Sequence, residues 1–192
     1  MVKSQKNDIT SILQYPTTAY AASGDWSLIE STIGLKLPED YKQFIEKYGS
    51  GKICDSVSII SPFVQNSDWS LLPYIQITTK SYQSYVDTGV INQLRFPTFP
   101  ALNGLLPFGT TENSNCLNWL TKGQPNSWEL IMWDPDTLEF VASGYRTLAD
   151  YLIAILKNEH GILPHDAPLG TSISEGFTAI DYDNSRFTKA IL

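Results

Sequence analysis

Residues 105–143 form the most regular stretch of the chain, and they constrain its fold most strongly. Short runs rich in apolar residues follow one another there, namely "LLPFG", "NCLNWL", "WELIMWD" and "TLEFVAS", and the last three alternate apolar and polar positions. The turn-forming segments "TKGQPNS" and "DPD" separate the later runs. Because alternation with a period of two is typical of strands, and short turns join antiparallel neighbours, this stretch predicts an antiparallel meander.

Helical patterns lie on both sides of the meander. Between Pro38 and Gly49 the apolar residues recur with the spacing of one helix face, so this segment predicts a helix that the glycine ends. The run from Leu148 to Leu156 shows the same spacing, and Thr147 with Asp150 resembles a capping box at its start. Both segments are therefore predicted to be amphipathic helices.

Three more elements are expected before the meander. Asp25 is placed to cap a short helix that runs to Ile33, and the segment 55–63, which is rich in β-branched residues, predicts a strand. Residues 71–94 fit a helix and, at "YIQIT", also a strand, and the helix is the better fit. This order predicts an α+β fold, an antiparallel or mixed sheet with helices packed on it.

The chain divides into three expected regions. Residues 1–24 are polar and predict an arm or a short helix, and residues 25–157 predict one α+β domain. In residues 158–192 glycines and prolines recur, and apolar residues come singly or in short groups. This last region is expected to be a C-terminal extension, and the sequence leaves its role open.

The segment "GSGK" at residues 49–52 raises the question of a phosphate-binding loop. A Walker-type loop needs a glycine five residues before its Gly-Lys pair and a hydroxyl after it, but Glu46 and Ile53 stand at those positions. The spacing fails at both ends. The glycines are therefore interpreted as a helix end, and no nucleotide cofactor is expected.

The net charge of the chain limits the classes of partner that it is expected to bind. The formal net charge is −7 with a sequence pI near 4.7, and the 13 Lys and Arg residues are spread along the chain, which argues against a nucleic-acid partner. An acidic surface suits solubility or a basic protein partner. A polar N-terminus without a following apolar stretch, and no apolar run of about 18 residues, favour a cytoplasmic protein without a membrane span.

Residues with catalytic or metal-binding chemistry are few and scattered. Cys54 and Cys116 are isolated, and the only histidines, His160 and His165, stand five apart across a glycine and a proline. This spacing does not suit two metal ligands on a helix, and no serine lies in a G-x-S-x-G elbow. We therefore expect no catalytic residues, no metal and no cofactor.

Aromatic and acidic residues of the meander leave two interpretations open. Trp119, Trp128 and Trp133 suit core packing, but tryptophan also stacks on sugars and anchors protein partners. Asp134 and Asp136 lie in "DPDTLE", a segment in which aspartate commonly caps a turn. A small hydrolase or sugar binder would need a tryptophan and a carboxylate together in a deep pocket.

Two blocks resemble the SUKH superfamily, named partly for yeast cell-wall regulators of the Smi/Knr type. "IGLKLPEDYKQFIEKYGSG" resembles its opening helix, and "LLPFGTTENSNCLNWLTKGQPNSWELIMWD" resembles its central strands. The closing helix around Tyr151 also agrees, so the resemblance covers about residues 25–157. One departure is the polar turn, where many members have Asp-x-Gly and this chain has residues 112–115, "ENSN".

The resemblance implies a non-enzymatic protein that works by contact with another protein. Members are chiefly bacterial immunity proteins that neutralise a cognate polymorphic toxin, often a nuclease, and others are scaffolds in cell-wall signalling. Both roles remain open for this chain. A nuclease toxin would be basic, so the partner-binding residues are expected among the acidic turns, at Glu112, Asp134, Asp136 and Glu139.

Overall fold

The alternating runs of residues 105–143 fold into consecutive antiparallel strands, as the sequence predicts. A computed structural model describes residues 9–65, 67–157, 176–184 and 186–189. The strands are β1 (Gly51–Ile53), β2 (Val57–Ile59), β3 (Leu105–Thr111), β4 (Cys116–Leu120), β5 (Glu129–Asp134), β6 (Glu139–Ala142), β7 (Phe177–Asp181) and β8 (Arg186–Lys189). The helices are α1 (Trp26–Ile33), α2 (Glu39–Tyr48), α3 (Leu71–Asp87) and α4 (Leu148–Leu156), with short 3₁₀ helices η1 (Ile9–Ser11) and η2 (Pro125–Ser127).

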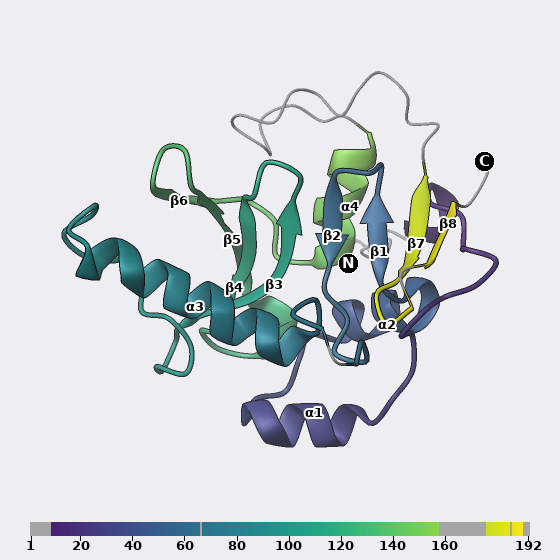
Figure 1. The fold of residues 1–192 in the computed structure, drawn as a ribbon, viewed down its shortest axis with the longest axis horizontal. Helices are drawn as coiled ribbons and strands as arrows, with labels where there is room; N and C mark the ends of the chain where they lie inside the picture. Colours follow the sequence, from purple (N-terminus) through teal and green to yellow (C-terminus); the bar gives the residue numbers. More distant parts are fainter. Residues whose placement is uncertain (1–8, 66, 158–175, 185, 190–192) are drawn as a thin grey trace, which may run out of the picture.

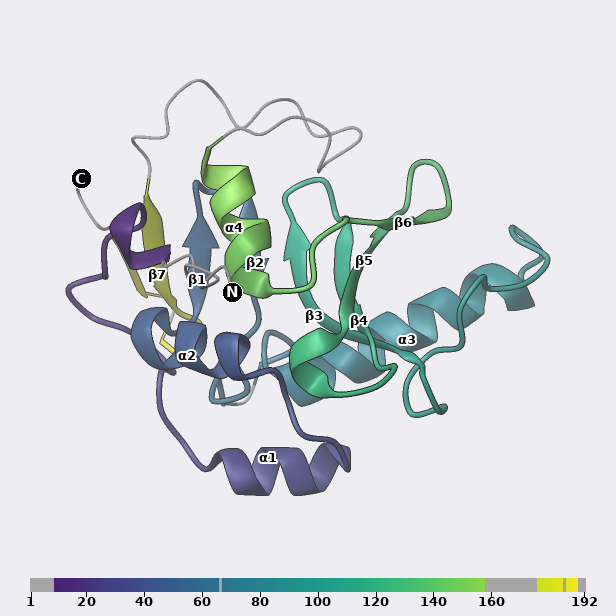
Figure 2. The ribbon, with the colours of Figure 1, turned by 180° about the vertical axis from the view of Figure 1, so that it is seen from behind.

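These strands form one 8-stranded sheet in the order β6-β5-β4-β3-β2-β1-β7-β8 (Figure 1). Neighbouring strands are antiparallel throughout this order. Helices pack on both of its faces. α3 crosses one face over β3, whereas α2 and α4 lie behind the sheet, as the reverse view shows (Figure 2). The expected α+β class is therefore confirmed, with an antiparallel sheet.

The hydrophobic core has a part on each face of the sheet. On the α2 and α4 side, Tyr41 of α2 meets Trp119 of β4 with ring centroids 5.0 Å apart, and Phe108 of β3 stacks on Trp119 at 3.9 Å. On the α3 side, Tyr82 packs against Trp133, at 5.5 Å. Because successive side chains of a strand point to opposite faces, β4 and β5 contribute to both parts of the core.

Helix boundaries follow the signals in the sequence. The carboxylate of Asp25 accepts hydrogen bonds from the amides of Ser27 and Leu28 at the start of α1, and Gly34 ends this helix with a φ of 76°. The hydroxyl of Thr147 accepts from the amide of Asp150 at 3.0 Å, which caps α4. Of residues 71–94, for which the helical spacing predicts a helix, residues 71–87 form α3, and its C-cap residue, Thr88, precedes Gly89 with its positive φ.

The "GSGK" segment joins α2 to an unexpected strand. Gly49 ends α2 with a φ of 70°, and the hydroxyl of Ser50 donates to the carbonyl of Ile180 at 2.6 Å. Gly51 and Lys52 then lie in β1. A Cβ atom at Gly51 would collide with the carbonyl oxygen of Thr178 and the ring of Phe177. This glycine is therefore required by the close approach of β7.

The described part of residues 158–192 continues the sheet. β7 pairs with β1, with Gly51 opposite Ala179, and β8 pairs with β7. The turn after β7 also contacts the loop before α3, where the ring of Tyr182 stacks on Trp69 with centroids 5.3 Å apart. Residues 176–184 and 186–189 therefore pack onto the α+β domain. His160 and His165 lie outside the described residues.

Candidate partner-binding surface

Three strand-to-strand turns lie at one end of the sheet. They are the β1–β2 turn (54–56), the β3–β4 turn (112–115) and the β5–β6 turn (135–138), at the top of Figure 1. The amide of Glu112 donates to the carbonyl of Ser56 at 2.8 Å, which joins the first two turns. Cys116 pairs with Trp133, which brings the third turn beside the second. We call this end of the sheet the turn surface.

The structure brings the expected site residues to this surface, but in two environments. Glu112, Asp136 and Glu139 are exposed to solvent. Asp134 is buried, with 2% of its surface exposed. Its carboxylate accepts hydrogen bonds from the amides of Asp136 at 2.9 Å and Thr137 at 3.3 Å. Asp134 therefore stabilises the β5–β6 turn from within, whereas Asp136 and Glu139 present their carboxylates to solvent.

Asp55 adds a carboxylate that the sequence did not single out. It lies in the β1–β2 turn, is partly buried, and accepts a hydrogen bond from the hydroxyl of Thr178 at 3.0 Å. Cys54 and Asp55 both have positive φ, at 50° and 52°, a conformation that aspartate tolerates better than most residues. The turn-forming segment "CDS" is a local signal, but its place beside Glu112 depends on the pairing of β2 with β3.

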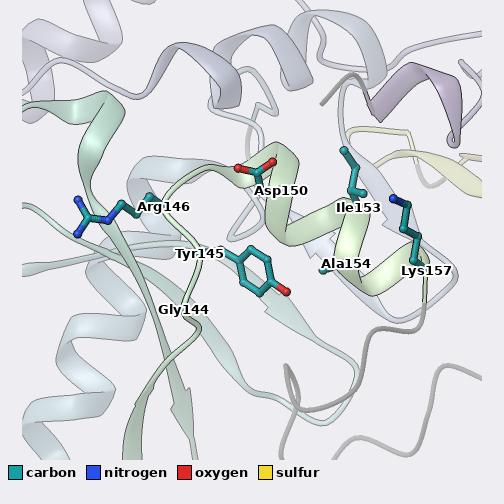
Figure 3. Close-up of a pocket in the computed structure, with 7 residues that line it drawn as sticks. All are labelled: Gly144, Tyr145, Arg146, Asp150, Ile153, Ala154 and Lys157. Carbon is teal, nitrogen blue, oxygen red and sulfur yellow. The ribbon is translucent and has the colours of Figure 1, made fainter. Parts of the chain in front are cut away.

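A depression of about 480 Å³ lies on the opposite face of the sheet from α3, between α4 and the segment that enters it (Figure 3). Its lining residues are Gly144, Tyr145, Arg146, Asp150, Ile153, Ala154 and Lys157. Arg146 extends away from α4, whereas Asp150 and Lys157 lie at opposite ends of that helix (Figure 3). The charged groups are therefore spread along the depression and do not converge on one point.

The three tryptophans of the meander belong to the core. Trp119, Trp128 and Trp133 have exposed fractions of 1%, 3% and 2%. Trp133 and Glu139 do line one shared depression, which measures about 230 Å³. Small-molecule sites are usually clefts of about 300–1,000 Å³. With so little of the Trp133 ring exposed, this depression offers a sugar no stacking face.

Within residues 9–65, 67–157, 176–184 and 186–189, no group of three or more His, Cys, Asp and Glu residues could hold a metal ion. Of the helices in this part of the chain, none has the length and apolar character needed to cross a bilayer.

Comparison with protein families shows to which family the chain belongs. The SUKH_6 family, described as SMI1-KNR4 cell-wall, matches residues 23–152. The chain belongs to the SUKH_6 family. The match includes the turns at 54–56, 112–115 and 135–138, whereas β7 and β8 lie beyond it. Searches of curated proteins and of solved structures found no match. Family membership supports a general role in binding another protein, of the immunity or the Smi/Knr type.

Proposed function

We propose that this SUKH_6 protein is a non-enzymatic immunity protein that binds a basic bacterial toxin, such as a nuclease, through its turn surface. The observation that carries the proposal is the grouping of three exposed carboxylates at one end of the sheet, with the partly buried Asp55 nearby. Glu112 lies in the β3–β4 turn, Asp136 in the β5–β6 turn, and Glu139 is the first residue of β6. These residues come from separate segments that the sheet brings to one end.

Electrostatics explains why such a surface suits a basic partner. A protein that binds nucleic acid must neutralise phosphates with Lys and Arg, so a nuclease presents a positive surface. An acidic patch attracts that surface over several ångströms and orients the two proteins before contact. The net charge of −7 adds a long-range attraction of the same sign.

The turns also provide a firm support for these side chains. Asp134 fixes the β5–β6 turn through two backbone hydrogen bonds. The β3–β4 turn is closed by the amide of Ser114, which donates to the carbonyl of Thr111 at 3.0 Å. Ordered turns lose little conformational entropy on binding, and this favours affinity.

The experiment that tests the proposal is capture followed by rescue. Tagged protein is used to capture partners from its native cell, and each candidate is then expressed with and without this chain in a sensitive host. We expect one captured protein to be toxic and the chain to restore growth. Capture of toxic proteins without any restoration of growth would contradict the proposal.

The family description favours a second candidate, a scaffold that acts in cell-wall regulation. It uses the same fold and also needs no catalysis. In the capture experiment it predicts an endogenous, non-toxic partner whose loss changes the cell wall. The identity of the captured protein therefore separates the two functions.

A further inference from the structure

The sheet has an outer strand, β6, that pairs on one side only. In the strand order β6 stands first, with β5 as its neighbour. The amide of Ser143 donates to the carbonyl of Leu130 at 2.9 Å, so the backbone of Ser143 faces β5. Because backbone groups alternate in direction along a strand, those of Phe140 and Ala142 face away from the sheet.

An independent contact agrees with this direction. The guanidinium of Arg95 lies beyond β6 and donates to the carbonyl of Phe140 at 3.2 Å. For the described part of the chain, no other hydrogen bond reaches the outward groups of Phe140 or Ala142. The N–H of Phe140 and the N–H and C=O of Ala142 thus form a short open edge.

A depression of about 230 Å³ lies beside this edge. Ile91 and Leu138 supply its accessible apolar surface, and Gln93, Arg95 and Glu139 supply polar and charged groups. Trp133 and Phe140 also line it but are only 2% and 5% exposed. Its volume suits a side chain better than a whole small molecule. A depression of side-chain size next to open backbone groups suits an added strand, because the backbone gives affinity and the depression gives specificity.

The charges near the edge indicate which kind of segment fits. Asp136 and Glu139 are exposed at the start of β6, and Arg95 is already engaged with Phe140 and with the ring of Phe96, 5.2 Å away. A segment that carries Lys or Arg would face these two carboxylates, and among the described residues they outnumber the one cation, Arg95, that lines the depression. A second copy of the chain would instead bring another net charge of −7 to the same edge.

We propose that β6 accepts an extended segment of a basic protein as an additional strand of the sheet. The segment donates to and accepts from Ala142, places an apolar side chain against Ile91 and Leu138, and directs a Lys or Arg side chain toward Asp136 and Glu139. The inference rests on the proposed function for the identity of the partner, whereas the open edge belongs to this chain alone.

The decisive variant is Ala142→Pro. Proline removes an N–H that points away from the sheet, so the pairing with β5 is preserved, as for prolines found on edge strands. We expect affinity for the captured partner to fall at least about tenfold, the effect of about 1.4 kcal/mol, with a melting temperature within about 3 °C of the original. Ala142→Ser keeps the N–H and is the matched control, with affinity changed less than about twofold.

A synthetic probe tests the edge without the toxin. The probe is an end-blocked heptapeptide of alternating Lys and Val, and its control is the same peptide N-methylated at every residue. We expect the probe to shift the amide NMR signals of Phe140 and Ala142, and the methylated peptide to leave them unchanged. Shifts that persist in Ala142→Pro at residue 140 would contradict pairing through Ala142.

The outcomes separate the two proposals. If a toxin is captured and Ala142→Pro binds it as tightly as the unchanged protein, the edge inference is wrong and the immunity function stands. If no toxin is captured, the peptide decides: shifted signals support the edge while the immunity function fails, and unshifted signals overturn both. A dimer that Ala142→Pro dissociates would assign the edge to a second copy and overturn the inference.

Discussion

Asp40 at the start of α2 holds the start of α4, which lies 108 residues further along the chain. Its Oδ2 accepts a hydrogen bond from the amide of Leu148 at 2.6 Å, and its Oδ1 accepts from the amide of Tyr41 at 2.8 Å. The first amides of a helix have no partner within the helix, so this carboxylate satisfies one of them. Burial raises the pKa of Asp40, although these hydrogen bonds act to lower it.

Replacement of this carboxylate should loosen the two helices. We expect Asp40→Ala to lower the free energy of unfolding by about 1–3 kcal/mol, because a buried amide of α4 loses its acceptor. Glu39→Ala, at the neighbouring exposed position, should cost less than about 1 kcal/mol. Urea denaturation measures both. Equal losses in the two variants would mean that the contact with Leu148 contributes little.

The buried carboxylate of Glu30 makes the stability of the folded protein depend on pH. Its side chain is 6% exposed and contacts Lys36 at 2.6 Å, the amide of Leu37 at 3.1 Å and Lys42 at 3.4 Å. Burial alone would raise the pKa of Glu30, but the hydrogen bonds from Lys36 and Leu37 and the charge of Lys42 outweigh it, and the pKa lies below its usual value of 4.5.

A lowered pKa gives the pH dependence a definite sign. The stabilisation by ionised Glu30 is present above pH 4.5 and is lost as the pH falls through the folded-state pKa. We expect Glu30→Gln to be less stable at neutral pH by about 1–2 kcal/mol, and this difference to shrink below pH 4.5. Urea titrations across this range measure it. A difference that stays constant would contradict the assignment.

Gly51 should tolerate substitution poorly for a steric reason. A methyl group there meets the backbone of Thr178 and the ring of Phe177 in β7. We expect Gly51→Ala to cost about 2 kcal/mol or more. Gly89→Ala is the control, since that glycine has a φ of 73° but open space around it, and should cost about 1 kcal/mol. Thermal unfolding compares the two, and a smaller loss at Gly51 would contradict the packing argument.

Replacement of Asp134 should lower stability more than replacement of Asp136. Asp134→Ala removes the acceptor of two backbone amides in the β5–β6 turn, and we expect it to lower stability by about 1–2 kcal/mol. Asp136→Ala changes an exposed side chain and should alter stability by about 0.5 kcal/mol at most. Chemical denaturation distinguishes them. If Asp136 proves the more costly, the turn is not held by Asp134.

Charge reversal on the turn surface should act on the rate of association. We expect Glu112→Lys combined with Asp136→Lys to slow binding of a basic partner at least about tenfold at low salt, with a smaller effect at high salt. Glu129→Lys combined with Asp87→Lys makes the same change in net charge away from the turn surface and is the matched control. Stopped-flow kinetics measures the rates. Equal rates in the two double variants would place the interface elsewhere.

Local patterns predicted the local structure well. The spacing of Tyr41, Phe44 and Tyr48 indicated α2, and the capping residues Asp25 and Thr147 marked the starts of α1 and α4. Each of these signals depends on neighbours within a few residues. The alternating meander likewise became β3 to β6 because short turns leave its strands little choice of partner.

The same local patterns could not predict contacts between residues far apart in the sequence. The three residues of β1 include Gly51 and Lys52, which are poor strand formers, and the strand is formed because β2 and β7 pair with it. The acidic turns could be recognised by composition, but the burial of Asp134 and the neighbourhood of Asp55 and Glu112 depend on sheet register. Register between distant strands leaves no short-range signal.

The pairing of β7 with β1 has a consequence during synthesis on the ribosome. The contact between Asp55 and Thr178 spans 123 residues, so β1 and β2 emerge long before β7 does. Until then one edge of β1 lacks its neighbour, and an uncovered edge is a template for pairing with other chains. The nascent protein therefore passes through an aggregation-prone interval that ends only when residues 177–181 have been translated and docked.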